Sequence, residues 1–103
     1  MTNNSTSFVG QHVIDDRHEP VGKVTDVLYD QDADHVEWLV VKPGLLGGER
    51  YVPADGAYQT ADGEVVVPFD KRWVKRGPKA GADHTLTTRE RAEVAAHFDV
   101  AVG

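Results

Sequence analysis

The chain has 103 residues, of which 40% are hydrophobic and 27% charged, a size and composition that suit one globular domain and not two. Its 17 acidic residues outnumber the 11 basic ones and give a formal net charge of -6, which works against non-specific attraction to nucleic-acid phosphates or anionic lipids. Cysteine is absent, which excludes disulfides, thiolate catalysis and cysteine-ligated metals. We expect no transmembrane segment, because no window approaches the roughly 20 apolar residues that a bilayer span requires.

The first seven residues, Met1 to Ser7, are polar and have neither the basic region nor the apolar stretch of a secretory signal. We expect them to form a short disordered lead on a cytoplasmic protein, and the lack of cysteine agrees with that location. The rest of the chain divides into a β-barrel domain at 8–78 and a linker with a C-terminal helix at 79–103.

Two strands are predicted in the first thirty residues. A first strand is expected over 8–14, followed by an acidic turn that ends at Pro20. The next run, 21–30, is rich in β-branched and aromatic residues and predicts a long, curved strand. Gly22 stands near its start, where we expect a bulge or a tight bend.

The stretch 36–53 holds the densest apolar run and reads as the central hairpin of the sheet. Both alternating sets of its first arm are apolar, so this strand is predicted to be covered on both faces, as the innermost strand of a closed barrel would be. A glycine-rich turn then leads to a returning arm at 50–53. A second, smaller hairpin is expected from 57–60 and 64–68. Five or six short strands without a helical period predict a mainly β fold, an antiparallel barrel or half-open sheet.

The last third of the chain changes character. Residues 69–76 are basic with aromatic residues between them, and 77–84 has the glycine and proline content of a linker. Thr87 and Glu90 have the spacing of a capping box, which predicts that a short C-terminal helix begins there. The apolar stripe of this helix, which includes Val94 and Phe98, could dock on the barrel or on a second subunit.

Several strand and turn patterns, together with the glycine-rich hairpin, match a known family. They are Phe8-Val9-Gly10, Val21-Gly22-Lys23-Val24, Asp30, Glu37-Trp38-Leu39-Val40-Val41, Tyr51-Val52-Pro53 and Val65-Val66-Val67-Pro68. Together they resemble the PRC-barrel domain, over roughly residues 8 to 78. The resemblance implies a small β-barrel used for docking and assembly, like the cytoplasmic part of the photosynthetic reaction centre H subunit and the C-terminal barrel of a bacterial ribosome-maturation factor. It supplies no catalytic residues.

The tail is also similar to the ending of stand-alone actinobacterial members of this family. The similarity rests on Gly77-Pro78, Leu86-Thr87 and Ala96-His97-Phe98. The chain departs from the family pattern at Ala54, where leucine is usual, and at Phe98 and Asp99, where tyrosine and glycine are usual.

No metal or cofactor is predicted. Asp30, Asp32 and Asp34 alternate like the early ligands of an EF-hand, but His35 and Val41 replace the glycine and glutamate that such a loop requires. The histidines show no short-range pairing of the metal-site kind. A zinc or nickel site becomes an alternative only if two or three of them meet in space. They are His12, His18, His35, His84 and His97.

The basic segment 71–79 is the best candidate for nucleic-acid contact, because cations meet phosphates while an aromatic ring can stack on a base. The alternative is a solvated face with Trp73 turned into the core, which the acidic net charge favours. The residues concerned are Lys71, Arg72, Trp73, Lys75 and Arg76.

Catalysis is not expected, because the only serines, Ser5 and Ser7, lie in the polar lead and no catalytic motif is present. Leu45 and Leu46 stand at the glycine-flanked tip of the central hairpin, where apolar residues often mark a partner surface. The alternative is that this loop caps the barrel end.

The leading hypothesis is a non-catalytic binding and assembly module that forms a homodimer or docks on another protein. Alternatives are an RNA or ribosome-associated factor that uses 71–79, and a small-ligand or metal-binding barrel. The predicted protein interface comprises Leu45, Leu46, Val94 and Phe98.

Overall fold

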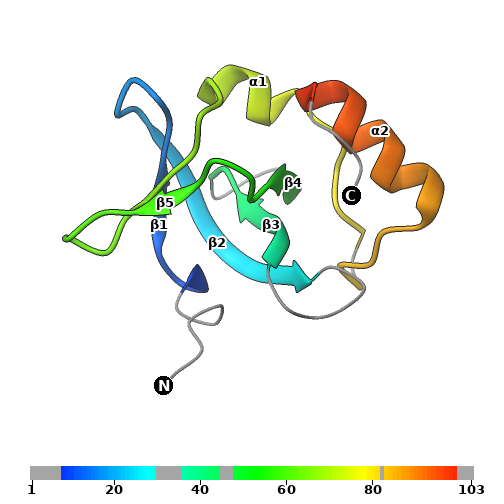
Figure 1. Ribbon diagram of the computed structural model, residues 1–103, viewed down its shortest axis with the longest axis horizontal. Helices are drawn as coiled ribbons and strands as arrows, with labels where there is room; N and C mark the ends of the chain where they lie inside the picture. Colours follow the sequence, from blue (N-terminus) through cyan, green and yellow to red (C-terminus); the bar gives the residue numbers. More distant parts are fainter. Residues whose placement is uncertain (1–7, 30–35, 45–47, 82, 100–103) are drawn as a thin grey trace.

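The computed structural model describes residues 8–29, 36–44, 48–81 and 83–99, which form one curved sheet and two helices (Figure 1). The six strands are β1 (His12–Ile14), β2 (Pro20–Tyr29), β3 (Val36–Lys42), β4 (Arg50–Pro53), β5 (Tyr58–Gln59) and β6 (Val65–Val66). The helices are α1 (Lys71–Lys75) and α2 (Thr88–Phe98). The mainly β class with a short C-terminal helix is therefore confirmed. No helix in these described ranges is long and apolar enough to cross a membrane.

The strands lie in the order β4-β3-β2-β1-β6-β5. Four of the five ladders are antiparallel, but β1 and β6 run parallel, so the expectation of a wholly antiparallel sheet is wrong for this pair. The reason is topological, since β6 follows β5 in a hairpin and returns beside β1 in the same direction. Within the described strands the edge strands β4 and β5 do not pair with each other, so the sheet is not closed and the predicted closed barrel is not confirmed.

Strand β2 is shared between two ladders and bends between them, as Figure 1 shows. Its first residues pair with β1, and Lys23 to Tyr29 pair with β3. Register shifts occur in both ladders. A Cβ on Gly22 would lie 2.1 Å from the carbonyl oxygen of Lys42, so only glycine fits where the end of β3 crosses this bend. The irregularity predicted at Gly22 is confirmed.

The core centres on β3, as its apolar pattern predicts. Trp38, Leu39, Val40 and Val41 are all buried, which confirms that this strand is covered on both faces. Full burial of one such side chain contributes about 1.5–3 kcal/mol. The arms of the central hairpin therefore hold the sheet together.

Helix α2 begins and docks as its sequence predicts. The Thr87 side chain accepts from the Glu90 N–H and the Glu90 carboxylate accepts from the Thr87 N–H, which completes the capping box. Val94 and Phe98 are 0% and 5% exposed in the same core as the sheet. Their apolar stripe therefore docks within the chain, and their assignment to an intermolecular interface is wrong.

Three smaller features differ from the sequence expectations. The first strand is only His12–Ile14, because the preceding residues turn through Gly10 at φ 90°. A short helix, α1, forms where only a basic segment was predicted. The expected linker is not free, because Lys79 pairs with Arg50 in a bridge and the Ala80 N–H donates to the Glu49 carbonyl at 2.8 Å.

Candidate functional site

Three basic side chains lie in one row across three adjacent strands. In the observed register His12 of β1 is opposite Lys23 of β2, and Lys23 is opposite Lys42 of β3. Directly opposite residues of antiparallel strands project from the same face, with Cβ atoms about 5 Å apart. All three side chains are exposed, and none forms a hydrogen bond or an ion pair with another described residue. We call these three residues the basic row.

No described acidic side chain forms an ion pair with the basic row, so the row lowers the stability of the sheet. Like charges directly opposite each other destabilise a sheet, and here Lys23 has a basic neighbour on each side. Lys42 is close enough to Glu49 to help lower the pKa of that carboxyl, after larger effects from Thr25 and His84. Lys23 lacks even this compensation. Such an arrangement is what a site for an external negative charge requires.

The basic row lines a groove of about 610 Å³ on the sheet. The floor is apolar and comes from Val13, Ile14 and Val21, while Pro43 lines the groove beyond the end of β3. Glu64 also lines the groove and directly precedes Val65, the partner of Val13, so it lies at the β6 end of the same row. The groove therefore combines an apolar floor with a charge gradient, acidic at β6 and basic at β3.

A second cluster binds the chain beyond α1 to the sheet. His84 Nδ1 lies 3.0 Å from Asp26 Oδ2, and its Nε2 lies 2.7 Å from Glu49 Oε1. The hydrogen bond that His84 donates to Glu49, followed by the one that it donates to Asp26, raises the pKa of His84. The pKa of Glu49 is lowered, chiefly by the Thr25 hydroxyl at 2.5 Å and then by His84. Both ring nitrogens thus face carboxylates, which favours the imidazolium form.

This His84 cluster has a structural task. The segment beyond α1 contacts β4 at Lys79, which pairs with Arg50, and at Thr85, whose carbonyl accepts from the Tyr51 hydroxyl at 2.8 Å. His84 adopts a left-handed backbone, with φ 55°, which places its ring between the carboxylates. The cluster therefore fixes this segment beside an edge strand that would otherwise be open.

Asp15 joins the β1–β2 turn to α1. It is 1% exposed, and its Oδ1 accepts from the Arg17 and Glu19 N–H groups, both at 2.8 Å. Its Oδ2 accepts from the Lys71 N–H at 3.0 Å. Burial raises the pKa of Asp15, but these three hydrogen bonds outweigh it and the pKa is lowered. Every oxygen of this carboxylate has a structural partner, which leaves no free acid or base.

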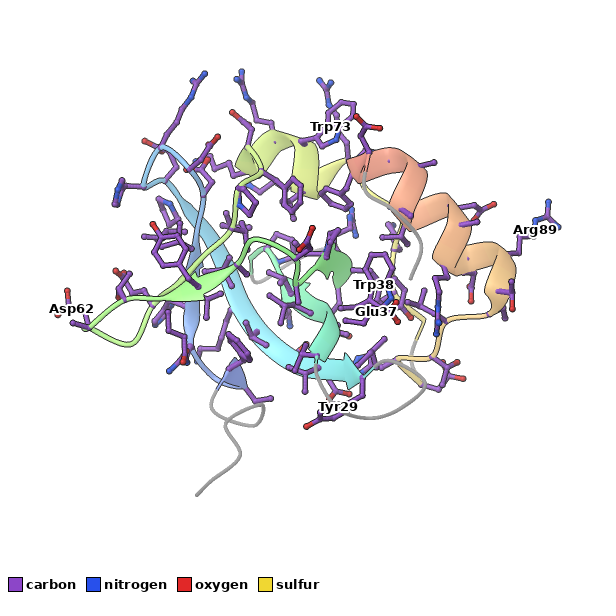
Figure 2. All side chains as sticks on the ribbon, viewed as in Figure 1. Tyr29, Glu37, Trp38, Asp62, Trp73 and Arg89 are labelled. Atoms are coloured by element: carbon purple, nitrogen blue, oxygen red, sulfur yellow. The ribbon has the colours of Figure 1, made fainter. Side chains whose placement is uncertain are left out.

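Trp73 lies where α1 meets the end of α2 (Figure 2). Its ring stacks on that of His97, with centroids 4.4 Å apart and planes 10° apart. Trp73 Nε1 donates to the His97 carbonyl at 2.8 Å, and His97 Nε2 donates to the Trp73 carbonyl at 2.8 Å. These two hydrogen bonds join the end of α2 to α1. Trp73 is 43% exposed and Val74 is buried in its place, so the alternative that put Trp73 in the core is wrong.

The other predicted nucleic-acid residues do not form one free basic patch. Lys71 pairs with Glu19 at 3.4 Å, and Arg72 pairs with Asp70 at 3.2 Å. Arg72, Trp73 and Arg76 do line a hollow of about 660 Å³ between the helices. Acidic side chains share that hollow, because Asp70 and Asp99 also line it.

Other predicted sites fall outside the described residues, namely the hairpin tip at Leu45 and Leu46 and the acidic turn at Asp30, Asp32 and Asp34. Among the described residues, no three histidine, aspartate or glutamate side chains are placed to hold a metal ion.

Sequence reasoning missed the basic row and the His84 cluster. Both arise from ladder register and from contacts between distant segments, since His84 is 58 residues from Asp26 and 35 from Glu49. No local sequence pattern predicts the basic row or the His84 cluster. A correct alignment of β1, β2 and β3 would have exposed the row.

Comparison with known proteins agrees with the fold. A search of curated proteins finds no match. The family model of the PRC-barrel domain matches residues 2–80, most of the chain. The chain therefore belongs to the PRC-barrel family.

Proposed function

We propose that this protein is a non-catalytic assembly module that binds another protein through the groove beside the basic row. Membership of the PRC-barrel family supports a binding or assembly role. The observation that carries the proposal is the pairing of Lys23 with Lys42 above an apolar floor, without a described carboxylate bound to either. A partner protein would shield the apolar floor from water and supply the negative charge that Lys23 and Lys42 lack.

The absence of a catalytic role is part of the proposal. Three of the groups with shifted pKa values, Asp15, Glu49 and His84, are held by hydrogen bonds that join segments of the fold. A general acid or base needs instead a free path to a substrate proton. A role in holding the fold together therefore explains the pKa shifts of these groups better than a role in catalysis does.

The groove suits a different chain better than a second copy of this one. A twofold dimer through the groove would bring together two copies of a surface that carries three basic residues and only one acidic residue, Glu64. Repulsion between the two rows would oppose that contact. A homodimer through Leu45 and Leu46 stays a separate prediction, because these residues lie outside the described ranges.

The RNA-associated alternative has less support. Lys71 and Arg72 already have acidic partners, and one face of Trp73 is covered by His97. RNA binding would need those cations freed for phosphates. RNA binding that survives neutralisation of the four cations of segment 71–76 would exclude this alternative as stated.

Affinity capture from the native cell, with chemical crosslinking, tests the proposal. The bait proteins are wild type, the double variant Lys23→Glu/Lys42→Glu, and a charge-matched control, Lys75→Glu/Arg89→Glu. Arg89 projects away from the sheet on α2 (Figure 2) and does not line the groove. We expect the same protein to be recovered by wild type and the control and lost by the groove variant. Recovery of one protein set by all three baits would overturn the proposal.

A further inference from the structure

We propose that the groove takes an extended, apolar protein segment that seats one aspartate or glutamate carboxylate between Lys23 and Lys42. This inference rests on the proposed function and adds the chemistry of the partner. It combines three observations, namely the charge of the basic row, the charge gradient along the groove and the short stretch of β2 at Pro20 and Val21 that β3 does not cover.

The positive charge of the basic row indicates which chemical group of the partner binds there. Lys23 and Lys42 face each other across the β2–β3 ladder and have no ion pair in the described chain. A carboxylate placed between two ammonium groups accepts charge-assisted hydrogen bonds from both. It also removes the repulsion that the free protein bears. The two lysines thereby gain more from an anion than two isolated surface cations would.

The charge gradient along the groove determines at which end the acidic residue of the segment binds. Glu64 at the β6 end would repel a second carboxylate, whereas the lysines at the β3 end attract one. The acidic residue of the partner therefore lies at the β3 end. Its neighbours cover the apolar floor that Val13, Ile14 and Val21 provide.

The backbone favours an extended chain over a lipid. The ladder between β2 and β3 begins at Lys23, and the Lys42 carbonyl and Pro43 pack against Gly22, so the side of β2 that faces away from β1 is open only at Pro20 and Val21. Pro43 follows the last residue of β3 and has no N–H with which to continue the ladder. An extended peptide can add main-chain hydrogen bonds along such an edge while its side chains fill the groove. A fatty acid has the carboxylate and the apolar body but cannot use the edge.

Peptide display tests the inference directly. The probe is a library of randomised peptides of about ten residues, which reach about 33 Å when extended. It is selected on the immobilised full chain and counter-selected on Lys23→Gln/Lys42→Gln. We expect enriched peptides to share one acidic residue at a fixed position among apolar neighbours. Replacing that residue by its amide, or using the lysine double variant, should weaken binding roughly tenfold or more, whereas Lys75→Gln/Arg89→Gln should not.

Three other results of the selection would contradict the inference, and each can be told apart from the others. Enriched apolar peptides that lack an acidic residue would reject the carboxylate, while recovery of a partner by the cell-based capture would leave the proposed function standing. Binding of dodecanoate or of phosphatidylglycerol vesicles, lost in the lysine variant and without any selected peptide, would assign the groove to lipids. If no peptide is enriched and no protein is captured, both the inference and the proposed function fail.

Discussion

His84 Nε2 lies 2.7 Å from Glu49 Oε1, although 35 residues separate them in the chain. Asp26 holds the other ring nitrogen at 3.0 Å. The ring thus ties the chain at His84 to β2 and to Glu49, the residue that precedes β4. Because β4 is an edge strand of the sheet, this contact protects an edge as well as adding stability.

The His84 cluster should make stability depend on pH in a defined window. The folded-state pKa of His84 is raised above its ordinary 6.5, so its contribution is complete below that value and is lost as pH rises through the folded pKa. The folded-state pKa of Glu49 is lowered below 4.5, so its contribution is present above that value and is lost as pH falls through the folded pKa. The maximum contribution lies between these ordinary values.

Replacement His84→Asn tests that window, since asparagine tolerates the left-handed backbone but carries no charge. We expect a loss of about 1–2 kcal/mol in the free energy of unfolding at about pH 5.5, and a smaller loss at about pH 9. Urea titrations at both pH values measure it. His18→Asn is the matched control, because His18 is exposed and has φ 65°. A loss that does not change with pH would contradict the assignment.

Asp15→Asn should be more damaging than its side-chain size suggests. The amide nitrogen cannot accept a hydrogen bond, so at least one of the N–H groups of Arg17, Glu19 and Lys71 loses its acceptor in a buried place. We expect a loss of about 1–3 kcal/mol by thermal or chemical unfolding at neutral pH. Asp16→Asn, on the exposed neighbouring residue, should change stability by less than about 0.5 kcal/mol. Equal losses in the two variants would refute the role given to Asp15.

The sequence predicted the strands and the C-terminal helix better than it predicted which strands pair with each other. The apolar pattern of β3 and the capping box of Thr87 and Glu90 are local signals, and both are confirmed. The parallel pairing of β1 with β6 depends on how the chain returns after the second hairpin, which no local pattern encodes. The basic row follows from the same kind of information. Sequence reasoning therefore found the core and missed the groove.

Gly22→Ala tests the crossing of β3 over the bend in β2. The added Cβ would lie 2.1 Å from the backbone carbonyl of Lys42, which cannot rotate away as a side chain would. We expect a loss of about 1–3 kcal/mol in chemical denaturation. Gly48→Ala is the control, since its nearest neighbour is the flexible side chain of Arg50 at 3.4 Å. Comparable stability of the two alanine variants would show that the bend has room to adjust.

The hairpin tip provides an independent test of self-association. Leu45 and Leu46 are predicted from sequence to form a partner surface, so Leu45→Asp/Leu46→Asp should convert a homodimer to a folded monomer. Size-exclusion chromatography with light scattering measures the mass, and circular dichroism confirms the fold. A wild-type monomer, or a dimer that the substitutions leave intact, would reject the homodimer.

The basic row should cost the free protein stability. Lys23 has His12 and Lys42 on its two sides, so Lys23→Gln removes repulsion without breaking an ion pair. We expect the free energy of unfolding to rise by about 0.2–1 kcal/mol at low salt, and the gain to shrink at about 1 M salt because repulsion is then screened. Lys71→Gln breaks the pair with Glu19 and should give no gain.

The same Lys23→Gln substitution should weaken binding of any peptide selected on the groove. A stability gain coupled to a loss of binding is the signature of a residue retained for its ligand and not for the fold. Denaturation and peptide titration on one protein sample measure both quantities. If Lys23→Gln destabilises the free protein, or stabilises it without affecting peptide binding, then the row is not a binding device and the lysines have another purpose.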